Sequence, residues 1–435
     1  MTKKALGFKE LLAIGIGGMI GGGIFTILGI SVSIAGFLAP FSIALGGVLA
    51  FFAGYAYVKL GVYYKDEGAT YAFFKRTFAN SHFAAAIIGW YTVFGYISTI
   101  ALYAYTFSSY SISLMSFGEN EIIRKIIAIL IVWTFAAINL WSVRGMGEVE
   151  DVIVYLKLFI LFIISFILFY FSKYDFHSFI RVLSSDFKNT PFLNILMVSS
   201  VTFVAYEGFQ LIINGVKDME EPDKNIPRAI YSAIFIVSMI YFIIALASVL
   251  SIDKNELIRN KEAALAVGMK SIVGEWGGAL VIFSAILATT SAINSTLFGS
   301  SRQLARIADD GYMPKILSFR KGTIPSYSIV TMAFVASLLI IIGNLRLILE
   351  FGSITFLLVS FLMSLANFKI KDKTNSSLII TLISMAGLFI GGVFIFYYEY
   401  KINKIELVFV FSLYVIIGIL AFFYARKKVE KDKNS

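Results

Sequence analysis

The sequence contains no cysteine and only two histidines, His82 and His177, among its 435 residues. Disulfide bonds, thiolate metal sites and cysteine nucleophiles are therefore excluded. A histidine-based metal centre is not expected either. Charged residues are also scarce, because they make up 15% of the chain, whereas about a quarter is usual in soluble proteins. We expect no metal and no cofactor.

Hydrophobic residues make up 58% of the chain. They gather in runs long enough to cross a bilayer, for which about 20 apolar residues suffice. The sequence therefore predicts an all-α polytopic membrane protein in which residues 1–435 form a single transmembrane domain within the lipid bilayer. Twelve spans are predicted: 8–34, 40–63, 84–112, 122–142, 151–171, 192–215, 228–250, 276–305, 326–343, 347–368, 377–398 and 405–424.

The distribution of lysine and arginine predicts the orientation in the membrane, because basic loops stay in the cytoplasm. With the N-terminus inside, 24 of the 37 basic residues fall in cytoplasmic segments and 12 in external ones, and Lys157 lies within a span. We therefore expect a cell-membrane protein with both termini in the cytoplasm. The same distribution accounts for the net charge of +10 without a nucleic-acid partner.

The run "GIGGMIGGGIF" (15–25) places six glycines inside the first span, although each glycine in a helix interior costs about 1 kcal/mol relative to alanine. Two interpretations are open. Glycines four residues apart allow helices to pack closely in membranes. Alternatively, the helix unwinds where it lines a cavity, and the freed N–H groups at a half-helix N-terminus bind an anion. A second break at a matching place would favour the latter.

The run "TFVAYEGFQLIINGV" (202–216) supplies such an interruption, with Glu207 and Gly208 in the middle of the sixth span. An ionised carboxylate there would cost roughly 2.5–3.5 kcal/mol. A broken first helix in each of two halves is typical of inverted-repeat transporters that bind substrate at the membrane midplane. The predicted parts are a first repeat of five helices (8–171), a second repeat of five (192–368), two additional helices (377–424) and a cytoplasmic tail (425–435).

Three stretches carry a resemblance to a known family. They are "GGMIGGGIF" (17–25), "FVAYEGFQ" with "EEPDKNIPRAI" (203–210 and 220–230), and "SRQLARIADDGYMPKILSF" with "TIP" (301–319 and 323–325). In these stretches and in its twelve-span plan, the chain resembles the amino acid–polyamine–organocation superfamily, whose members have the leucine-transporter type of fold. It is most similar to prokaryotic proton-coupled amino-acid transporters of broad specificity.

The resemblance implies a substrate site at the two breaks. The substrate carboxylate would meet the backbone N–H groups of Gly22 and Gly23. Its ammonium would meet the carbonyl groups of Met19, Val204 and Glu207. Both assignments agree with the physics of unwound backbone, in which N–H groups suit an anion and carbonyls suit a cation.

Side chains from the third, sixth and eighth spans would shape the pocket, namely Tyr96, Phe203 and Tyr206 among others. Ordinary packing is the alternative for Tyr96. Glu207 departs from the family pattern, which more often has a small or apolar residue there. Three interpretations of its side chain remain open: it selects a cationic substrate, it binds a second proton, or it packs with a hydrogen bond to Tyr206 or to the tenth span.

Lys157 in "VYLKLFI" lies about six residues inside the fifth span. Its ammonium could snorkel to the cytoplasmic interface. Alternatively, it is a buried amine that loads and releases a proton. In proton-coupled relatives a lysine here takes the place of a sodium ion, near the carbonyls of Gly17 and Ile20 and the hydroxyls of the eighth span. The matching hydroxyls here are those of Thr289, Thr290 and Ser291.

These observations predict a secondary active amino-acid transporter, a proton symporter that works by alternating access, and not an enzyme. A channel would need a filter or polar pore rings, and an enzyme would need clustered acid or base residues within the spans. Neither pattern is visible in the sequence. The alternatives left open are an amino-acid or polyamine exchanger and a sodium-coupled carrier. The expected partners are a small-molecule amino acid, with a cationic one among the alternatives, and protons.

Overall fold

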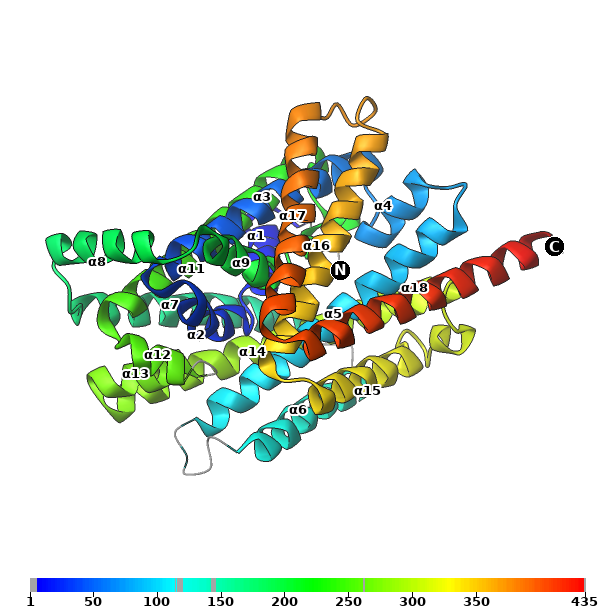
Figure 1. The fold of residues 1–435 in the computed structure, drawn as a ribbon. Helices are drawn as coiled ribbons and strands as arrows, with labels where there is room; N and C mark the ends of the chain where they lie inside the picture. The colour runs from blue at the N-terminus through cyan, green and yellow to red at the C-terminus, as the bar shows by residue number, and fades with distance from the viewer. Residues whose placement is uncertain (1–5, 114, 116–119, 142–145, 261–262, 434–435) are drawn as a thin grey trace.

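The computed structural model describes residues 6–113, 115, 120–141, 146–260 and 263–433. Within these ranges the chain is helical apart from connections and two isolated bridges (Figure 1). The α-helices are α1 (Phe8–Met19), α2 (Gly23–Ala35), α3 (Ala39–Tyr64), α4 (Ala69–Thr77), α5 (His82–Ile112), α6 (Glu121–Trp141), α7 (Met146–Tyr170), α8 (Phe176–Asn189), α9 (Phe192–Val201), α10 (Leu211–Asn214), α11 (Pro222–Ser251), α12 (Lys254–Arg259), α13 (Ala264–Val273), α14 (Glu275–Asp309), α15 (Ser326–Ile342), α16 (Leu345–Lys369), α17 (Leu378–Ile402) and α18 (Lys404–Lys433). Four 3-10 helices complete the set: η1 (Gly36–Leu38), η2 (Thr202–Tyr206), η3 (Val216–Asp218) and η4 (Lys315–Ser318).

The all-helical fold agrees with the prediction, and every predicted span overlaps one or more of these helices. Among the described residues, nine stretches are long and apolar enough to cross a membrane. One of them, Gly23–Tyr64, contains both α2 and α3, because η1 joins them without a break. The helix α15 has 17 residues and is shorter than these nine. A crossing number of twelve therefore remains a prediction.

Two segments are more helical than the sequence suggested. The stretch 172–191 contains α8, whose first turn is capped by Asp175, with its carboxylate accepting a hydrogen bond of 3.0 Å from the Ser178 N–H. Such a cap satisfies a backbone donor at a helix start. The backbone N–H of Phe37 donates to Asp186 of α8 at 2.9 Å, which fixes this helix beside η1. The connection between α11 and α14 contains two further short helices, α12 and α13.

The last helix, α18, continues beyond the predicted end of the twelfth span and reaches Lys433, so most of the predicted tail is helical. Two pairs with a spacing of four residues lie in this part, Arg426 with Glu430 and Lys428 with Asp432. Pairs at this spacing support an exposed helix. In Figure 1, α18 crosses the bundle and its end extends past the neighbouring helices.

Long-range packing places the two interrupted segments in the interior. The helix α11 packs against α1 and α3, and α5 packs against both α14 and α16. The helix α7 contacts α1, α11 and α14, and η2 contacts α2, α3 and α16. The chain between α1 and α2 and the chain between η2 and α10 are therefore both surrounded by other helices (Figure 1).

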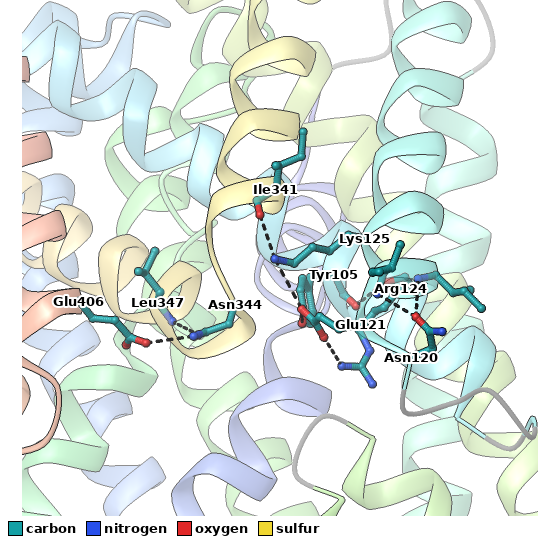
Figure 2. Close-up of polar contacts among 12 residues, drawn as sticks. Tyr105, Asn120, Glu121, Arg124, Lys125, Ile341, Asn344, Leu347 and Glu406 are labelled. Carbon is teal, nitrogen blue, oxygen red and sulfur yellow. Dashed lines mark hydrogen bonds and ion pairs between the residues drawn. The ribbon is translucent and has the colours of Figure 1, made fainter.

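Polar contacts tie α6 to its neighbours, as Figure 2 shows. Glu121 accepts hydrogen bonds from Tyr105 of α5 and from Arg124, the latter at 2.8 Å. Lys125 donates to the backbone carbonyl of Ile341 at 2.9 Å, at the end of α15. These contacts hold α6 between α5 and α15, which lie side by side with it.

Candidate functional site

The first interruption lies where the sequence predicted it. The helix α1 ends at Met19 and α2 begins at Gly23. Between them the backbone leaves the helical region at Ile20, whose ψ is 77°. The first span is therefore two half-helices, and the N-terminus of α2 lies inside the protein. Gly23 also contacts Ala205 closely, because a Cβ on Gly23 would lie 2.7 Å from the Ala205 Cβ. The glycines thus serve both unwinding and close packing.

The second interruption follows η2 and lies directly against the first. Glu207 has an extended backbone with ψ of 142°, and Gly208 has a φ of +130°, which favours glycine. A Cβ on Gly208 would lie 2.4 Å from the carbonyl carbon of Gly18 and 2.7 Å from the Met19 nitrogen. The two breaks therefore meet backbone to backbone.

Tyr241 of α11 bridges the two breaks, and sequence reasoning missed it. Its hydroxyl lies 2.8 Å from the Met19 carbonyl oxygen and 3.1 Å from that of Ala205, so it donates its proton to these two acceptors. Tyr241 is fully buried. No sequence motif marks it, because a tyrosine in a long apolar helix is usually a packing residue. Its role is visible only once α11 is placed beside α1 and η2.

We expect Tyr241→Phe to lower the free energy of unfolding by about 1–3 kcal/mol, because the buried carbonyls of Met19 and Ala205 would each lose one donor, the Met19 carbonyl keeping the N–H of Gly21. The measurement is thermal unfolding of the purified protein in detergent. Tyr327→Phe is the matched control, since that side chain is 47% exposed. Equal unfolding temperatures for the two variants would contradict the bridging role.

Lys157 is fully buried and lies against the first break. Its ammonium donates to the carbonyl oxygens of Gly17 at 3.0 Å and Ile20 at 2.6 Å. These are the two carbonyls that the family resemblance implies. The side chain comes from α7, which packs against α1. Carbonyl dipoles compensate part of the cost of burying the charge, and snorkelling to the interface is not what the structure shows.

The hydroxyls expected from the eighth span lie on α14, which packs against α7. Thr289 donates to the Ala285 carbonyl at 2.6 Å and Thr290 to the Ile286 carbonyl at 2.7 Å, both within their own helix. The hydroxyl of Ser291 is buried and has no hydrogen-bond partner among the described residues. Of the three, Ser291 is therefore the hydroxyl left available for a new contact.

Glu207 is 4% exposed, and its carboxylate turns toward its own break. Its Oε2 accepts a hydrogen bond of 2.8 Å from Gln210. Gln210 in turn accepts one of 2.9 Å from the Gly208 N–H. Of the three interpretations left open for Glu207, the hydrogen bond to Tyr206 or to the tenth span is not the one seen, because Gln210 of the same break is the donor. The other oxygen of Glu207, Oε1, is buried without a partner among the described residues.

The remaining predicted pocket residues do not all lie together. Tyr206 points away from the breaks, because its hydroxyl donates to the Ile43 carbonyl of α3 at 2.7 Å. Phe203 is fully buried. The Val204 carbonyl accepts a bond of 3.2 Å from the Glu207 N–H, and its own N–H donates to the Ser353 hydroxyl of α16 at 3.4 Å.

Tyr96 lines a cavity with a volume of about 520 Å³. The cavity is bordered by α4, α5, α10, α14 and Arg320. Its lining includes Glu67, Tyr71, Leu211, Asn214, Ser295, Arg302 and Arg306. The charge distribution predicts that the connections at its edge, 65–81 and 306–325, are cytoplasmic. The cavity thus extends from the predicted inner side to Tyr96.

The third family stretch forms part of this edge. Asp310 accepts hydrogen bonds of 2.7 Å from both Tyr71 and Lys75 of α4. Burial, together with the Asp310 carboxylate, raises the pKa of Tyr71, so the phenol stays a hydrogen-bond donor. Trp90 of α5 donates to the Tyr312 carbonyl at 2.9 Å. The loop after α14 is therefore hydrogen-bonded to both α4 and α5 at the mouth of the cavity.

Two broken helices in contact, buried within a bundle of membrane-length apolar helices, are typical of membrane transporters. The family model described as "Amino acid permease" matches residues 6–429. The chain belongs to the amino acid permease family. It is therefore a multi-pass membrane protein that transports amino acids, and it is not an enzyme.

Several characterised and uncharacterised proteins are similar to the chain. An uncharacterized protein of Methanocaldococcus jannaschii is 28% identical over 99% of this chain and 97% of its own length. The inner membrane transport protein YbaT of Escherichia coli is 28% identical over 87% of each chain. The serine/threonine exchanger SteT of Bacillus subtilis is 26% identical over 72% of this chain and 70% of its own.

Proposed function

We propose that the protein is an amino acid/proton symporter that works by alternating access in the cell membrane. In this proposal both termini are cytoplasmic and the first ten spans form two inverted repeats. The proposal rests chiefly on one observation: the fully buried Lys157 ammonium donates to two carbonyls of the first break. Because this ammonium can lose its proton, the conformation of the first break can depend on whether Lys157 is protonated.

The substrate would bind where the two breaks meet. Its carboxylate would accept from the N–H groups of Gly22 and Gly23, at the positive end of the α2 dipole. Its ammonium would meet the carbonyls of Met19, Val204 and Glu207. The Met19 carbonyl already accepts a hydrogen bond from the Tyr241 hydroxyl. A bound ammonium would therefore compete with that hydroxyl, and substrate binding would change how α11 is held to α1.

Proton release would weaken the contact between α7 and α1. A neutral amine no longer attracts the two carbonyls as an ion does, because charged hydrogen bonds are about twice as strong as neutral ones. The α1 half-helix would then move more freely against α7 and α14. The hydroxyls of Thr289, Thr290 and Ser291 on α14 would lie beside the moving half-helix. Among the described residues Ser291 has no hydrogen-bond partner, so its hydroxyl could form a new contact.

Exchange is the second candidate, because the similar protein SteT is a serine/threonine exchanger. An exchanger would use the same substrate site but would need amino acid on both sides. Symport and exchange therefore differ in what drives net uptake. Symport needs a proton gradient, whereas exchange needs an internal amino acid.

The test is uptake of labelled amino acids into liposomes that hold the purified protein, in sodium-free buffer. We expect uptake to rise with an inward proton gradient and to occur in empty liposomes. Uptake that needs preloaded amino acid, with or without the gradient, would replace symport by exchange. Uptake that needs sodium would overturn the role of Lys157. Competition by serine, arginine and a polyamine then sorts the substrates by charge.

A further inference from the structure

Three carboxylates gather where α16, α17 and α18 meet. Glu350 belongs to α16, Glu399 to α17 and Glu406 to α18. One carboxylate oxygen from each lies within 4.8 Å of the other two. Glu350 and Glu399 are each 2% exposed, and Glu406 is half-buried. The charge distribution predicts this end of the helices to be external, so Glu406 provides an approach from outside the cell.

The negative charge of the cluster exceeds the positive charge that the protein brings to it. Among the described residues, Arg346 is the one cation paired with these carboxylates. It donates to Glu350 at 2.8 Å and also to Glu399. Glu406 receives a neutral donor instead, because the Asn344 amide donates to its Oε1 at 3.0 Å (Figure 2). Three carboxylates and one guanidinium leave two negative charges uncompensated when all are ionised.

A second observation points to a ligand. One oxygen of each carboxylate, Oε2 of Glu350, Glu399 and Glu406, is buried and has no hydrogen-bond partner among the described residues. Buried carboxylate oxygens are normally satisfied by donors or by a cation. The two bonds of Arg346 are made to the other oxygens, both Oε1. One acceptor on each of three helices is therefore left to bind something positive.

The spacing suits a hard divalent cation. Ca²⁺ takes oxygen ligands at 2.3–2.6 Å, so two ligands of one ion lie at most about 5 Å apart. The oxygens of this cluster meet that limit. Carboxylate oxygens without histidine or cysteine favour Ca²⁺ or Mg²⁺ over zinc or copper. Ca²⁺ is the better match, because it tolerates irregular geometry, whereas Mg²⁺ demands a near-ideal octahedron.

We propose that Glu350, Glu399 and Glu406 form a divalent-cation site, of the Ca²⁺ type, that joins the two C-terminal helices α17 and α18 to α16. Water would complete the coordination on the side of Glu406. The site has a structural connection to the second break. Ser353, one turn after Glu350, donates to the Val201 carbonyl and accepts from the Val204 N–H of η2. A cation at this end would stiffen the helix that supports η2.

Calorimetric titration of the purified full-length protein with CaCl₂ tests the proposal, with MgCl₂ and NaCl titrations alongside. We expect one Ca²⁺ site with a dissociation constant of about 10⁻⁴–10⁻³ M, as in extracellular Ca²⁺ modules, and a higher unfolding temperature in Ca²⁺. Glu399→Gln and Glu406→Gln should each weaken Ca²⁺ binding at least about tenfold. Glu275→Gln, at an exposed acid on the same predicted side, should bind Ca²⁺ like the unchanged protein.

Glu406 is only half-buried, so we expect Glu406→Gln to fold even if Glu399→Gln does not. Ca²⁺ binding can then still be tested with the Glu406→Gln variant. The absence of Ca²⁺ binding up to about 10 mM, an order of magnitude above that affinity, would overturn the proposal. In that case the carboxylates would share protons among themselves. Undiminished binding in the folded Glu406→Gln variant would also overturn it, because the ion would then lie elsewhere. Neither result depends on whether transport is coupled to protons.

Discussion

Replacing Lys157 by methionine should reduce gradient-driven amino-acid uptake to the level of protein-free liposomes. Methionine has a similar length but no charge, so the carbonyls of Gly17 and Ile20 lose the donor that holds them. Proton coupling would lose its titratable group at the same time. The measurement is initial uptake at fixed substrate with an inward proton gradient. Lys188→Met, at an exposed lysine of α8, is the matched control and should transport normally.

The Lys157→Arg variant separates two roles of Lys157, its positive charge and its ability to release a proton. Arginine stays protonated at any pH that the protein survives, so it can satisfy the carbonyls but cannot release a proton. We expect this variant to fold, to exchange internal for external amino acid, and to show no response to the gradient. Gradient-driven uptake in Lys157→Arg equal to that of the unchanged protein would contradict the coupling role of the amine.

Gly208→Ala should abolish transport and destabilise the protein. The backbone of Gly208 has a φ of +130°, which typically costs a residue with a side chain about 1–3 kcal/mol. Its Cβ would also meet the carbonyl carbon of Gly18 at 2.4 Å, and backbone atoms cannot turn aside as side chains do. The two breaks must then separate. Displacing binding groups by about 1 Å commonly reduces rates about 100-fold, and we expect at least that loss in uptake.

Gly392→Ala is the matched control for this prediction. Gly392 lies within α17, and a Cβ there would meet no atom within 4 Å. An alanine in a helix interior is favoured over glycine by about 0.5–1 kcal/mol, so this variant should be as stable as the unchanged protein or slightly more so. Uptake and thermal unfolding report both effects. Normal uptake by Gly208→Ala would show that the breaks need not touch.

The sequence predicted the parts of the fold that depend on periodicity and glycine content. Long apolar runs predicted the membrane helices. The six glycines in 15–25 and the "YEG" of the sixth span predicted the two breaks. Their direct contact could not be predicted, because it depends on how α1 and η2 are placed by α3 and α11. The helix α8 was not predicted, although Phe179, Ile180, Leu183 and Phe187 recur at helical spacing, because the stretch is too polar to span a membrane.

The positions of the site's backbone groups were predictable, because the breaks follow from sequence motifs. The directions of its side chains were less predictable. Lys157 lies at the two carbonyls that the family resemblance implied. Tyr206 instead contacts α3, because an aromatic ring in a 3-10 helix can face either side and the neighbouring glycines of α3 leave room for it. Tyr241 and the carboxylates of α16, α17 and α18 carry no local signal. Tyr241 contacts groups from other segments of the chain, and the three carboxylates come from three different helices. Only the packed structure therefore brings these groups together.

In the proposed function, amino acids cross the membrane together with protons. The most direct measurement is the internal pH of liposomes that contain the protein and a trapped pH-sensitive dye, followed after an amino acid is added outside in sodium-free buffer. We predict internal acidification that begins with substrate addition, matches labelled uptake in time, and is absent in Lys157→Arg. Labelled amino acid entering without any change of internal pH would contradict symport.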